Sequence, residues 1–351
     1  MGHRTVVASA PGRIDLVGWA DGVYPGLGKV CNLAINLRSE VRVRFCPKEG
    51  VGVMRRGVLS GHQILFPGMA YGNPWDLYQA AVNRYQLDGL NIEASSRIPW
   101  GSGLGGSGAT GVALVAALSQ LENPPQKLAG LDLSSAETYA FIAQEARALE
   151  TEEMGASSGW QDQYAAAFGG INLWVAVDDP QIPHRMPWQP NPHQVSAIES
   201  HLLLIKTPEG EPRNSSDIQK GEVDLSVLPS MTKNAELAFS YLQDGRFDLL
   251  GTILSDTWEY SRQLTYNRVH TSELGALMGL LYFRDAYGWK ACGSGGFGSC
   301  MVASVDPNIK AQIENELLVD RPNWDGYSIL RFRLDFEGVK VHSFGLSEHY
   351  H

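Results

Sequence analysis

The chain has 351 residues, of which 44% are hydrophobic and 19% are charged, and its formal net charge is −10. These values are typical of a globular protein and exclude a disordered chain, and the length predicts two lobes instead of one compact core. The acidic balance argues against non-specific nucleic-acid binding, which needs a basic surface, but it allows a local cationic site for a small anionic ligand.

The sequence predicts a cytoplasmic protein with no membrane or nucleic-acid partner. No apolar run reaches membrane-spanning length, and no apolar segment of the secretory type follows Met1-Gly2-His3-Arg4. The scattered cysteines, none of them in a C-x-x-C pair, are Cys31, Cys46, Cys292 and Cys300. This pattern indicates reduced, inert thiols. The oligomeric state stays open, with a homodimer as one alternative.

The first half of the chain is predicted to contain strands and two helices. Runs rich in β-branched residues predict strands at residues 5–16, 39–45, 50–59, 90–98 and 169–177. After a glycine-rich loop at residues 101–108, helical spacing predicts a helix that ends near Leu121. Ser134 and Glu137 form a predicted capping box for a second helix, which reaches Glu150.

The second half is predicted to form a lobe of its own. Residues 178–196 are rich in Pro, His and Asn and mark the expected boundary between an N-terminal lobe at 1–180 and a C-terminal lobe at 197–346. The remaining predicted elements are strands at 201–206, 299–305 and 328–337 and helices at 229–243, 247–264 and 272–287. Because strands and helices alternate without strict βαβ order, the predicted fold class is α+β.

The most informative segment is Pro99-Trp-Gly-Ser-Gly-Leu-Gly-Gly-Ser-Gly-Ala109. Five of the eight residues from Gly101 to Gly108 are glycine, so the backbone N–H groups can approach a ligand closely. Together with the N-terminus of the following helix, they form a predicted anion cradle, and Ser107 offers a hydroxyl to a metal ion. A flexible glycine turn is the plain alternative.

Two stretches also satisfy the dinucleotide-binding pattern G-x-G-x-x-G, one from Gly101 and one from Gly293. A Rossmann unit requires in addition a second strand that ends in an acidic residue about twenty residues on. Glu122 lies at that distance, but no strand precedes it, and the second match leads from a loop into a strand. A nicotinamide oxidoreductase is therefore the weaker rival, and the lack of G-x-x-x-x-G-K-[ST] excludes a Walker-type site.

Two polar segments supply candidate catalytic groups. Asp162 lies between two glutamines, which suits a base that accepts a hydroxyl proton, although it also suits a helix cap. Arg13 and Asp21 belong to the stretch at residues 9–21. Arg13 is a candidate partner of Asp162 that offsets phosphoryl charge, and Asp21 a candidate for binding sugar hydroxyls. A surface ion pair and a turn aspartate are the alternatives.

Together these segments resemble the signature of the GHMP kinases, the group of galactokinase, homoserine, mevalonate and phosphomevalonate kinases. The A-P-G-R block, the phosphate loop and the glycine block at residues 290–300 follow the family's order and span nearly the whole chain. Residues 159–170 and Arg213-Asn-Ser-Ser216 resemble bacterial heptose-7-phosphate kinases, and the G-W-Q-D-Q core also resembles L-fucokinase. The resemblance implies a sugar 1-kinase that uses ATP and Mg²⁺.

The resemblance also implies a fold and a site. The fold has a ribosomal S5 domain 2-like N-terminal lobe and a ferredoxin-like C-terminal lobe, with the site in the cleft between them. Asp162 matches the catalytic aspartate and Arg13 its partner, while Ser107 and Glu150 match metal-binding positions. The residues implied to bind ATP are Pro99, Gly101, Ser102, Gly103, Leu104, Gly105, Gly106, Ser107 and Gly108. Those implied to bind substrate are Trp19, Asp21, Gly159, Trp160, Gln161, Gly295 and Gly296.

The chain departs from the family pattern in two places, and several alternatives stay open. The first block is one residue shorter than usual between Arg13 and Asp21, so the sugar and its phosphorylation state are not fixed. Gly106 stands where the family has its first phosphate-loop serine. The tryptophans near the blocks either stack on a sugar or fill the core, and Glu150 alone also reads as an exposed helix charge. A galactose-, fucose- or mevalonate-type kinase and a non-catalytic sugar- and ATP-binding sensor are the remaining alternatives.

Overall fold

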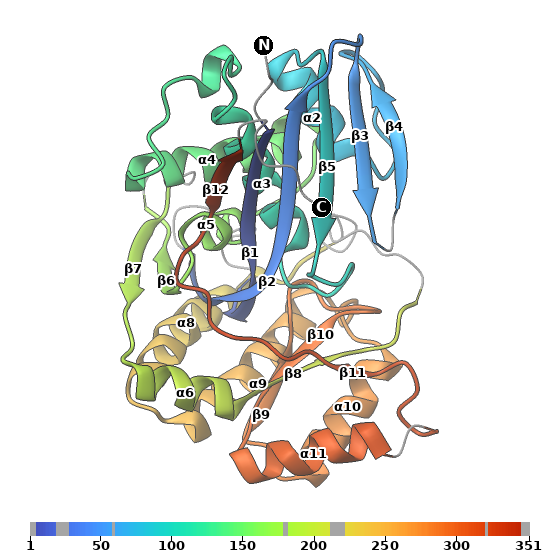
Figure 1. Ribbon diagram of the computed structural model, residues 1–351. Helices are drawn as coiled ribbons and strands as arrows, with labels where there is room; N and C mark the ends of the chain where they lie inside the picture. Colours follow the sequence, from blue (N-terminus) through green and yellow to red (C-terminus); the bar gives the residue numbers. More distant parts are fainter. Residues whose placement is uncertain are drawn as a thin grey trace.

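The computed structural model describes residues 5–18, 28–57, 60–177, 182–210, 222–319 and 322–344. The chain forms two lobes, each built on a β-sheet with packed helices (Figure 1). This arrangement confirms the predicted two-lobe α+β class. Trp19, Asp21 and the segment Arg213-Asn-Ser-Ser216 lie outside the described residues. None of the helices in the described part is both long and apolar enough for a membrane span.

The N-terminal lobe is built on an eight-stranded sheet. Its strands are β1 (Thr5–Val17), β2 (Lys29–Phe45), β3 (Val51–Arg56), β4 (Gly61–Leu65), β5 (Leu90–Ser96), β6 (Ile171–Val175), β7 (His184–Trp188) and β12 (Lys340–Phe344). The main order is β12-β1-β2-β5-β3-β4, and β6 and β7 continue from β2. Because β2 is long, its first part pairs with β6 and its last part with β5.

Helices pack against this sheet and carry the predicted site segments (Figure 1). They are α2 (Asp76–Tyr85), α3 (Gly106–Ser119), η1 (Gln126–Leu128), α4 (Ala136–Ala148), the π-helical turn η2 (Leu149–Glu153) and α5 (Gln161–Phe168). The side chains of α3 from Val112 to Leu118 are all apolar, and the helix is buried from Gly111 to Ser119 against β1, β2, α4 and α5. The glycine-rich loop is therefore anchored to the buried centre of the lobe.

The C-terminal lobe contains an antiparallel four-stranded sheet of order β11-β8-β10-β9. Its strands are β8 (Leu202–Lys206), β9 (Gly288–Ala291), β10 (Cys300–Ser304) and β11 (Ser328–Ile329). Its helices are α6 (Pro192–His201), η3 (Leu225–Val227), α8 (Leu228–Gln243), α9 (Phe247–Leu264), α10 (Ser272–Phe283) and α11 (Pro307–Val319). Side chains of β10 alternate between two cores: Val302 joins the core of the N-terminal lobe, and Met301 a separate core. One hydrophobic core thus continues across both lobes.

The predicted lobe boundaries need correction at both ends. The segment predicted to separate the lobes contains β7, which pairs with β6 and extends the N-terminal sheet. The range predicted for the C-terminal lobe contains β12, which returns to pair with β1 (Figure 1). β7 is the antiparallel partner of β6, the strand directly before it, whereas β12 pairs with the first strand of the chain, so no local pattern reveals to which lobe β12 belongs.

Several element ends also differ from the prediction. The strand predicted at residues 328–337 is only β11, because the chain leaves β8 and crosses to the other lobe, where Leu334 bridges Ile35. The cap of α4 is Ser135, whose side chain accepts from the N–H of Thr138, and not Ser134. Helix α10 ends at Phe283, before the left-handed residue Asp285, and not at 287.

Candidate active site

An ion pair between Arg13 and Asp162 joins β1 to the first turn of α5. Nε and Nη2 of Arg13 donate to the same carboxylate oxygen, Oδ1 of Asp162, at 2.9 and 2.6 Å. The Arg13 side chain is 4% exposed and that of Asp162 27%. The structure thus brings the two predicted residues together, with the arginine buried and the carboxylate still open to solvent.

Arg13 also holds the glycine-rich loop. Its Nη1 donates to the carbonyl of Gly103, and its backbone N–H donates to the carbonyl of Leu104 at 2.9 Å. Burial acts to lower the pKa of Arg13, but the charges of Asp162 and Asp15 outweigh it, so this pKa lies above its ordinary value. A permanently charged guanidinium therefore fixes the loop relative to Asp162.

The loop and the start of α3 lie directly against Asp162. A Cβ atom on Gly105, the N-cap residue, would lie 3.5 Å from Oδ2 of Asp162, and one on Gly108 would lie 2.8 Å from the Asp162 Cβ. The first backbone N–H groups of a helix have no partner within the helix, and the dipole is positive at this end. Leu104 is fully buried and Ser102 nearly so, so these two residues offer mainly backbone to a ligand. An anion cradle and a carboxylate are thus side by side.

A second glycine loop, residues 293–298, approaches from the C-terminal lobe between β9 and β10. The N–H of Cys300 donates to the carbonyl of Ser102 at 2.8 Å. Within its own lobe, Gly296 donates its N–H to Val269 at 3.0 Å, and Gly295 lies close to the same residue. The loop that contains the predicted residues Gly295 and Gly296 is therefore held by its own lobe and, through Cys300, by the phosphate loop.

The contact between the two glycine loops gives a first prediction. An alanine Cβ at Gly103 would lie 2.1 Å from the carbonyl oxygen of Cys292, and the φ of Gly103 is +72°. We expect Gly103→Ala to lower the free energy of unfolding by about 2–5 kcal/mol, from left-handed strain and overpacking together. Urea denaturation followed by tryptophan fluorescence measures this change.

Gly101→Ala is the matched control for this variant. Gly101 has a φ of +70°, but its nearest neighbour, the carbonyl of Phe297, would be 4.0 Å from an added Cβ. The control should therefore lose only about 1–2 kcal/mol from backbone strain. Equal losses in the two variants would show that the loops separate easily and that their contact contributes nothing.

Glu150 lies in η2 and is buried, so the alternative of an exposed helix charge is wrong. Its Oε2 accepts from the hydroxyl of Ser158 at 2.9 Å and from Nε2 of Gln163 at 2.8 Å. Burial raises the pKa of Glu150, and hydrogen bonds from Ser107 and Ser158 oppose this rise only in part. A hydrogen bond therefore joins Glu150 to Ser107, the two residues that the resemblance assigns to metal-binding positions.

The donor set around Ser107 fits Mg²⁺. Its hydroxyl and the Glu150 carboxylate are hard oxygen donors, and Mg²⁺ takes one or two protein carboxylates and completes its shell with water and phosphate oxygens. Across the described ranges, no group of three or more His, Cys, Asp or Glu side chains is placed to hold a metal ion. A magnesium ion at this position would depend on the phosphates of a nucleotide.

Trp160 does not line the site, although the sequence analysis placed it among the substrate residues. Its side chain is 1% exposed, and its ring meets those of Tyr164 and Trp174 edge-on at centroid distances of 6.3 and 6.5 Å. A ring enclosed on all sides cannot stack on a sugar. Trp160 is thus a core residue, whereas Trp100 in the phosphate loop is 44% exposed.

Gly159 and Gln161, the two chain neighbours of Trp160, have different surroundings from its ring. The carbonyl of Gly159 accepts from Nε of Arg147 at 3.2 Å. The Gln161 amide lies next to Gly18, where an added Cβ would be 2.9 Å from its Nε2 and 2.8 Å from Oδ2 of Asp15. Gln161 therefore lies where β1 leads toward the segment that holds the predicted Asp21.

Arg84 was missed by the sequence analysis, and it holds the turn that carries Glu150. From α2 it donates to Glu145 at 2.9 Å, to Glu152 at 2.8 Å and to Glu153 at 3.3 Å. Glu145 is buried, whereas Glu152 is exposed. The run of acidic residues at 150–153 is the signal that could have indicated a cationic partner, but nothing in the sequence points to residue 84.

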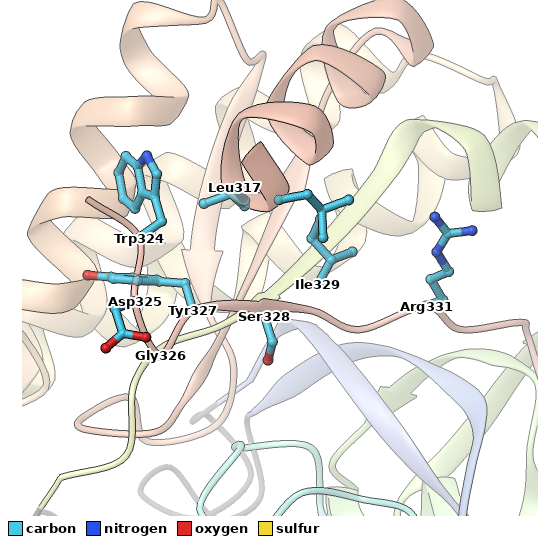
Figure 2. Close-up of a pocket in the computed structure, with 9 residues that line it drawn as sticks. Leu317, Trp324, Asp325, Gly326, Tyr327, Ser328, Ile329 and Arg331 are labelled. Atoms are coloured by element: carbon cyan, nitrogen blue, oxygen red, sulfur yellow. The ribbon is translucent and has the colours of Figure 1, made fainter. Parts of the chain in front are cut away.

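A hollow on the C-terminal lobe lies apart from these residues (Figure 2). It is bordered by the end of α11 and the segment that leads through β11, and Trp324 and Tyr327 meet edge-on there at 5.2 Å. None of the residues that line it was predicted to belong to the site.

Two family descriptions match the chain. "GHMP kinases N terminal domain" matches residues 74–170, and "GHMP kinases C terminal" matches residues 238–318. The chain belongs to the GHMP kinases. Members of this family are ATP-dependent small-molecule kinases, so the dehydrogenase reading of the two G-x-G-x-x-G stretches is set aside.

Three relatives illustrate how this GHMP kinase compares with known proteins. It is 28% identical to D-glycero-alpha-D-manno-heptose 7-phosphate kinase of Campylobacter jejuni, over 76% of each chain. It is 26% identical to mevalonate kinase of Pyrococcus furiosus, over 96% of this chain and 98% of the relative. The solved structure of a D-glycero-D-manno-heptose 1-phosphate kinase from Bacteroides thetaiotaomicron superposes with a TM-score of 0.71 at 20% identity, over 98% and 100% of the two chains, and supports the fold alone.

Proposed function

We propose that this protein transfers the γ-phosphoryl group of ATP to the anomeric hydroxyl of a heptose 7-phosphate or a related sugar. The observation that carries the proposal is the position of the Asp162 carboxylate. One oxygen, Oδ1, is held by Arg13, and the other, Oδ2, faces Gly105 at the N-terminus of α3. A base, a buried cation and an anion cradle then converge where a hydroxyl and a phosphate would react.

Asp162 and Arg13 have distinct roles in this mechanism. As the sugar oxygen forms its bond to the γ-phosphorus, Oδ2 of Asp162 accepts the hydroxyl proton. The bond between the γ-phosphorus and the bridging oxygen breaks, and ADP leaves with that oxygen. Arg13 orients the carboxylate through Oδ1 and supplies positive charge close to the reacting group.

The phosphate loop and Glu150 bind the nucleotide in this proposal. Backbone N–H groups of residues 105–108 at the start of α3 donate to the phosphate oxygens. Ser107 and Glu150 would hold Mg²⁺, which when bound neutralises phosphate charge. Ser158 and Gln163 keep the Glu150 carboxylate oriented toward Ser107. The loop's contact with the C-terminal lobe fixes its shape before nucleotide arrives.

The choice of an anomeric acceptor rests on similarity, with chemistry in support. Residues 159–170 resemble heptose kinases, and a heptose 7-phosphate kinase is 28% identical over 76% of the chain. An anomeric hydroxyl is more acidic than an ordinary alcohol, so a carboxylate can accept its proton as transfer proceeds.

We place the reaction in the cytoplasm, because all four cysteines are free.

An acceptor screen tests this proposal. Purified protein with Mg-ATP is offered heptose 7-phosphates, L-fucose, galactose, mevalonate and homoserine, and ADP release is measured. We expect turnover with a sugar whose product shows phosphorus NMR coupling to the anomeric proton. A trace of hydrolysis without acceptor is subtracted with a no-sugar control.

Each other outcome of the screen has a defined meaning. Phosphate at any other carbon rejects the anomeric assignment but keeps a sugar kinase. Turnover with mevalonate alone favours the second candidate, to which the mevalonate kinase match over 96% of the chain gives weight. Tight binding of ATP and sugar without any turnover indicates the sensor.

A further inference from the structure

A second ion pair, between Asp15 and Lys290, joins the two lobes and is enclosed more completely than the first. Nζ of Lys290 donates to Oδ2 of Asp15 at 2.7 Å and to its backbone carbonyl at 3.2 Å. The exposed fractions of the two side chains are 0% for Lys290 and 1% for Asp15. Asp15 lies on β1 of the N-terminal lobe, and Lys290 on β9 of the C-terminal lobe.

Both oxygens of the Asp15 carboxylate bind groups of the other lobe. Oδ2 accepts from Lys290, and Oδ1 accepts from the backbone N–H of Gly293 at 2.8 Å. Gly293 is the first residue of the second glycine loop, and a Cβ atom on it would lie 2.9 Å from the Cα of Gly103. One carboxylate thus fixes the point at which the C-terminal loop touches the phosphate loop.

Asp15 is also adjacent to the catalytic pair. It lies two residues after Arg13 on the same strand, so the two side chains leave β1 on the same face. The negative charge of Asp15 contributes to the raised pKa of Arg13. The buried charges of Lys290, Asp15 and Arg13 and the partly exposed charge of Asp162 therefore alternate in sign from the C-terminal lobe to the base.

Stability alone does not account for this arrangement. Removing two charges from water is costly, and apolar residues of similar volume often replace a buried ion pair without loss of stability. The neighbouring core is apolar and includes Cys292, Cys300 and Val302, so an apolar pair would be compatible with its surroundings. What an apolar pair cannot supply is the directional hold on the N–H of Gly293 and the negative charge near Arg13.

We propose that Asp15 and Lys290 are positioning residues for phosphoryl transfer. The pair fixes the second glycine loop against the phosphate loop, and thereby holds the backbone donors of the phosphate loop where they meet the nucleotide. Such donors function only within about 0.5 Å of their productive position. The inference rests on the proposed kinase function only in assuming that the phosphate loop binds ATP.

The test separates nucleotide binding from stability with a double variant. Asp15→Leu combined with Lys290→Met replaces the pair by apolar residues, and we expect its melting temperature to stay within a few degrees of the wild type. The dissociation constant for Mg-ATP, measured by calorimetry without any sugar, should rise by at least about tenfold. Lys290→Met alone leaves a buried, unpaired carboxylate and should lower the melting temperature strongly.

The matched control is the ion pair between Arg38 and Asp335. Its N···O distance is 2.5 Å, both side chains are largely buried, and the pair also joins segments that are distant in the chain. Within the described part of the chain, its side chains bond to Ser9, Glu337 and Gly338, which lie outside both glycine loops, so Arg38→Met with Asp335→Leu should leave the Mg-ATP dissociation constant unchanged. The proposal is overturned if the Asp15 and Lys290 double variant is folded and binds Mg-ATP like the wild type. It is also overturned if the control pair weakens binding equally.

The two proposals fail separately, because this readout needs no acceptor. A wild-type protein that binds Mg-ATP but phosphorylates no sugar rejects the sugar kinase and leaves the positioning test intact. Where the wild type turns over, the double variant should also lose kcat at saturating ATP, since a displaced loop misaligns the transferred phosphoryl group. Loss of activity that follows the melting temperature across all variants would assign the pair a structural role only.

Discussion

Asp162→Asn should lower kcat by about 10²–10⁴-fold, the usual loss when a general base is removed. Asparagine keeps an oxygen at the Oδ1 position, so Nε and Nη2 of Arg13 retain an acceptor and the loop contacts of Arg13 are preserved. The amide that replaces Oδ2 cannot accept the hydroxyl proton. The affinity for Mg-ATP should therefore change little while turnover collapses, and steady-state kinetics with the acceptor found in the screen measure the loss.

Asp248→Asn is a matched control for this variant. Asp248 also lies in the first turn of a helix and is also held by an arginine, since Arg246 donates to its two oxygens at 3.0 and 2.8 Å. Both residues are exposed; Asp248 lies in α9 of the other lobe, and Arg246 is the N-cap residue of that helix. The control should keep kcat within about twofold. A loss of less than fivefold in Asp162→Asn would mean that Asp162 only orients the substrate.

The parts of the site that follow from local pattern were predictable from the sequence. The glycine-rich run before an apolar helix predicts the phosphate loop, because a cradle of backbone donors requires residues without side chains. The resemblance assigned Ser107 and Glu150 to metal-binding positions, and a hydrogen bond joins the two residues. The sequence did not determine whether Glu150 is exposed or buried, because its burial against Ser158 and Gln163 depends on how η2 packs.

The parts that depend on distant pairing were not predictable. Trp160 lies within a site motif, yet its ring packs against Trp174. Its position in the motif therefore does not distinguish a ring that stacks on a sugar from a ring that packs in the core. The charges at Asp15 and Lys290 are 275 residues apart in the chain. Only the packing of the C-terminal lobe against the end of β1 shows that each is the partner of the other. The pairing of β12 with β1 is hidden for the same reason.

Glu150→Gln should weaken the response to magnesium and stabilise the metal-free protein at the same time. If the Glu150 carboxylate holds Mg²⁺ with Ser107, its loss should raise the magnesium concentration for half-maximal activity by at least about tenfold, with partial rescue by excess metal. Glu137→Gln, an exposed residue in the first turn of α4, is the control and should leave the magnesium response unchanged. An unchanged response in Glu150→Gln would remove Glu150 from the metal site.

The stability effect of Glu150→Gln follows from the sign of the pKa shift. Burial raises the pKa of Glu150 in the folded state, so the folded protein binds this proton more tightly than the unfolded chain. The stability gained from this tighter proton binding is fully present at pH values below the pKa of the glutamate in the unfolded chain. It is lost as the pH rises through the higher pKa of Glu150 in the folded protein. At neutral pH without metal, the charged carboxylate therefore destabilises the fold, and glutamine removes that cost. We expect the variant to melt about 2 °C higher than the wild type in EDTA at pH 7.5, with the difference shrinking as pH falls toward 5. A variant that melts lower at pH 7.5 would show that the hydrogen bonds from Ser158 and Gln163 to the carboxylate outweigh its burial.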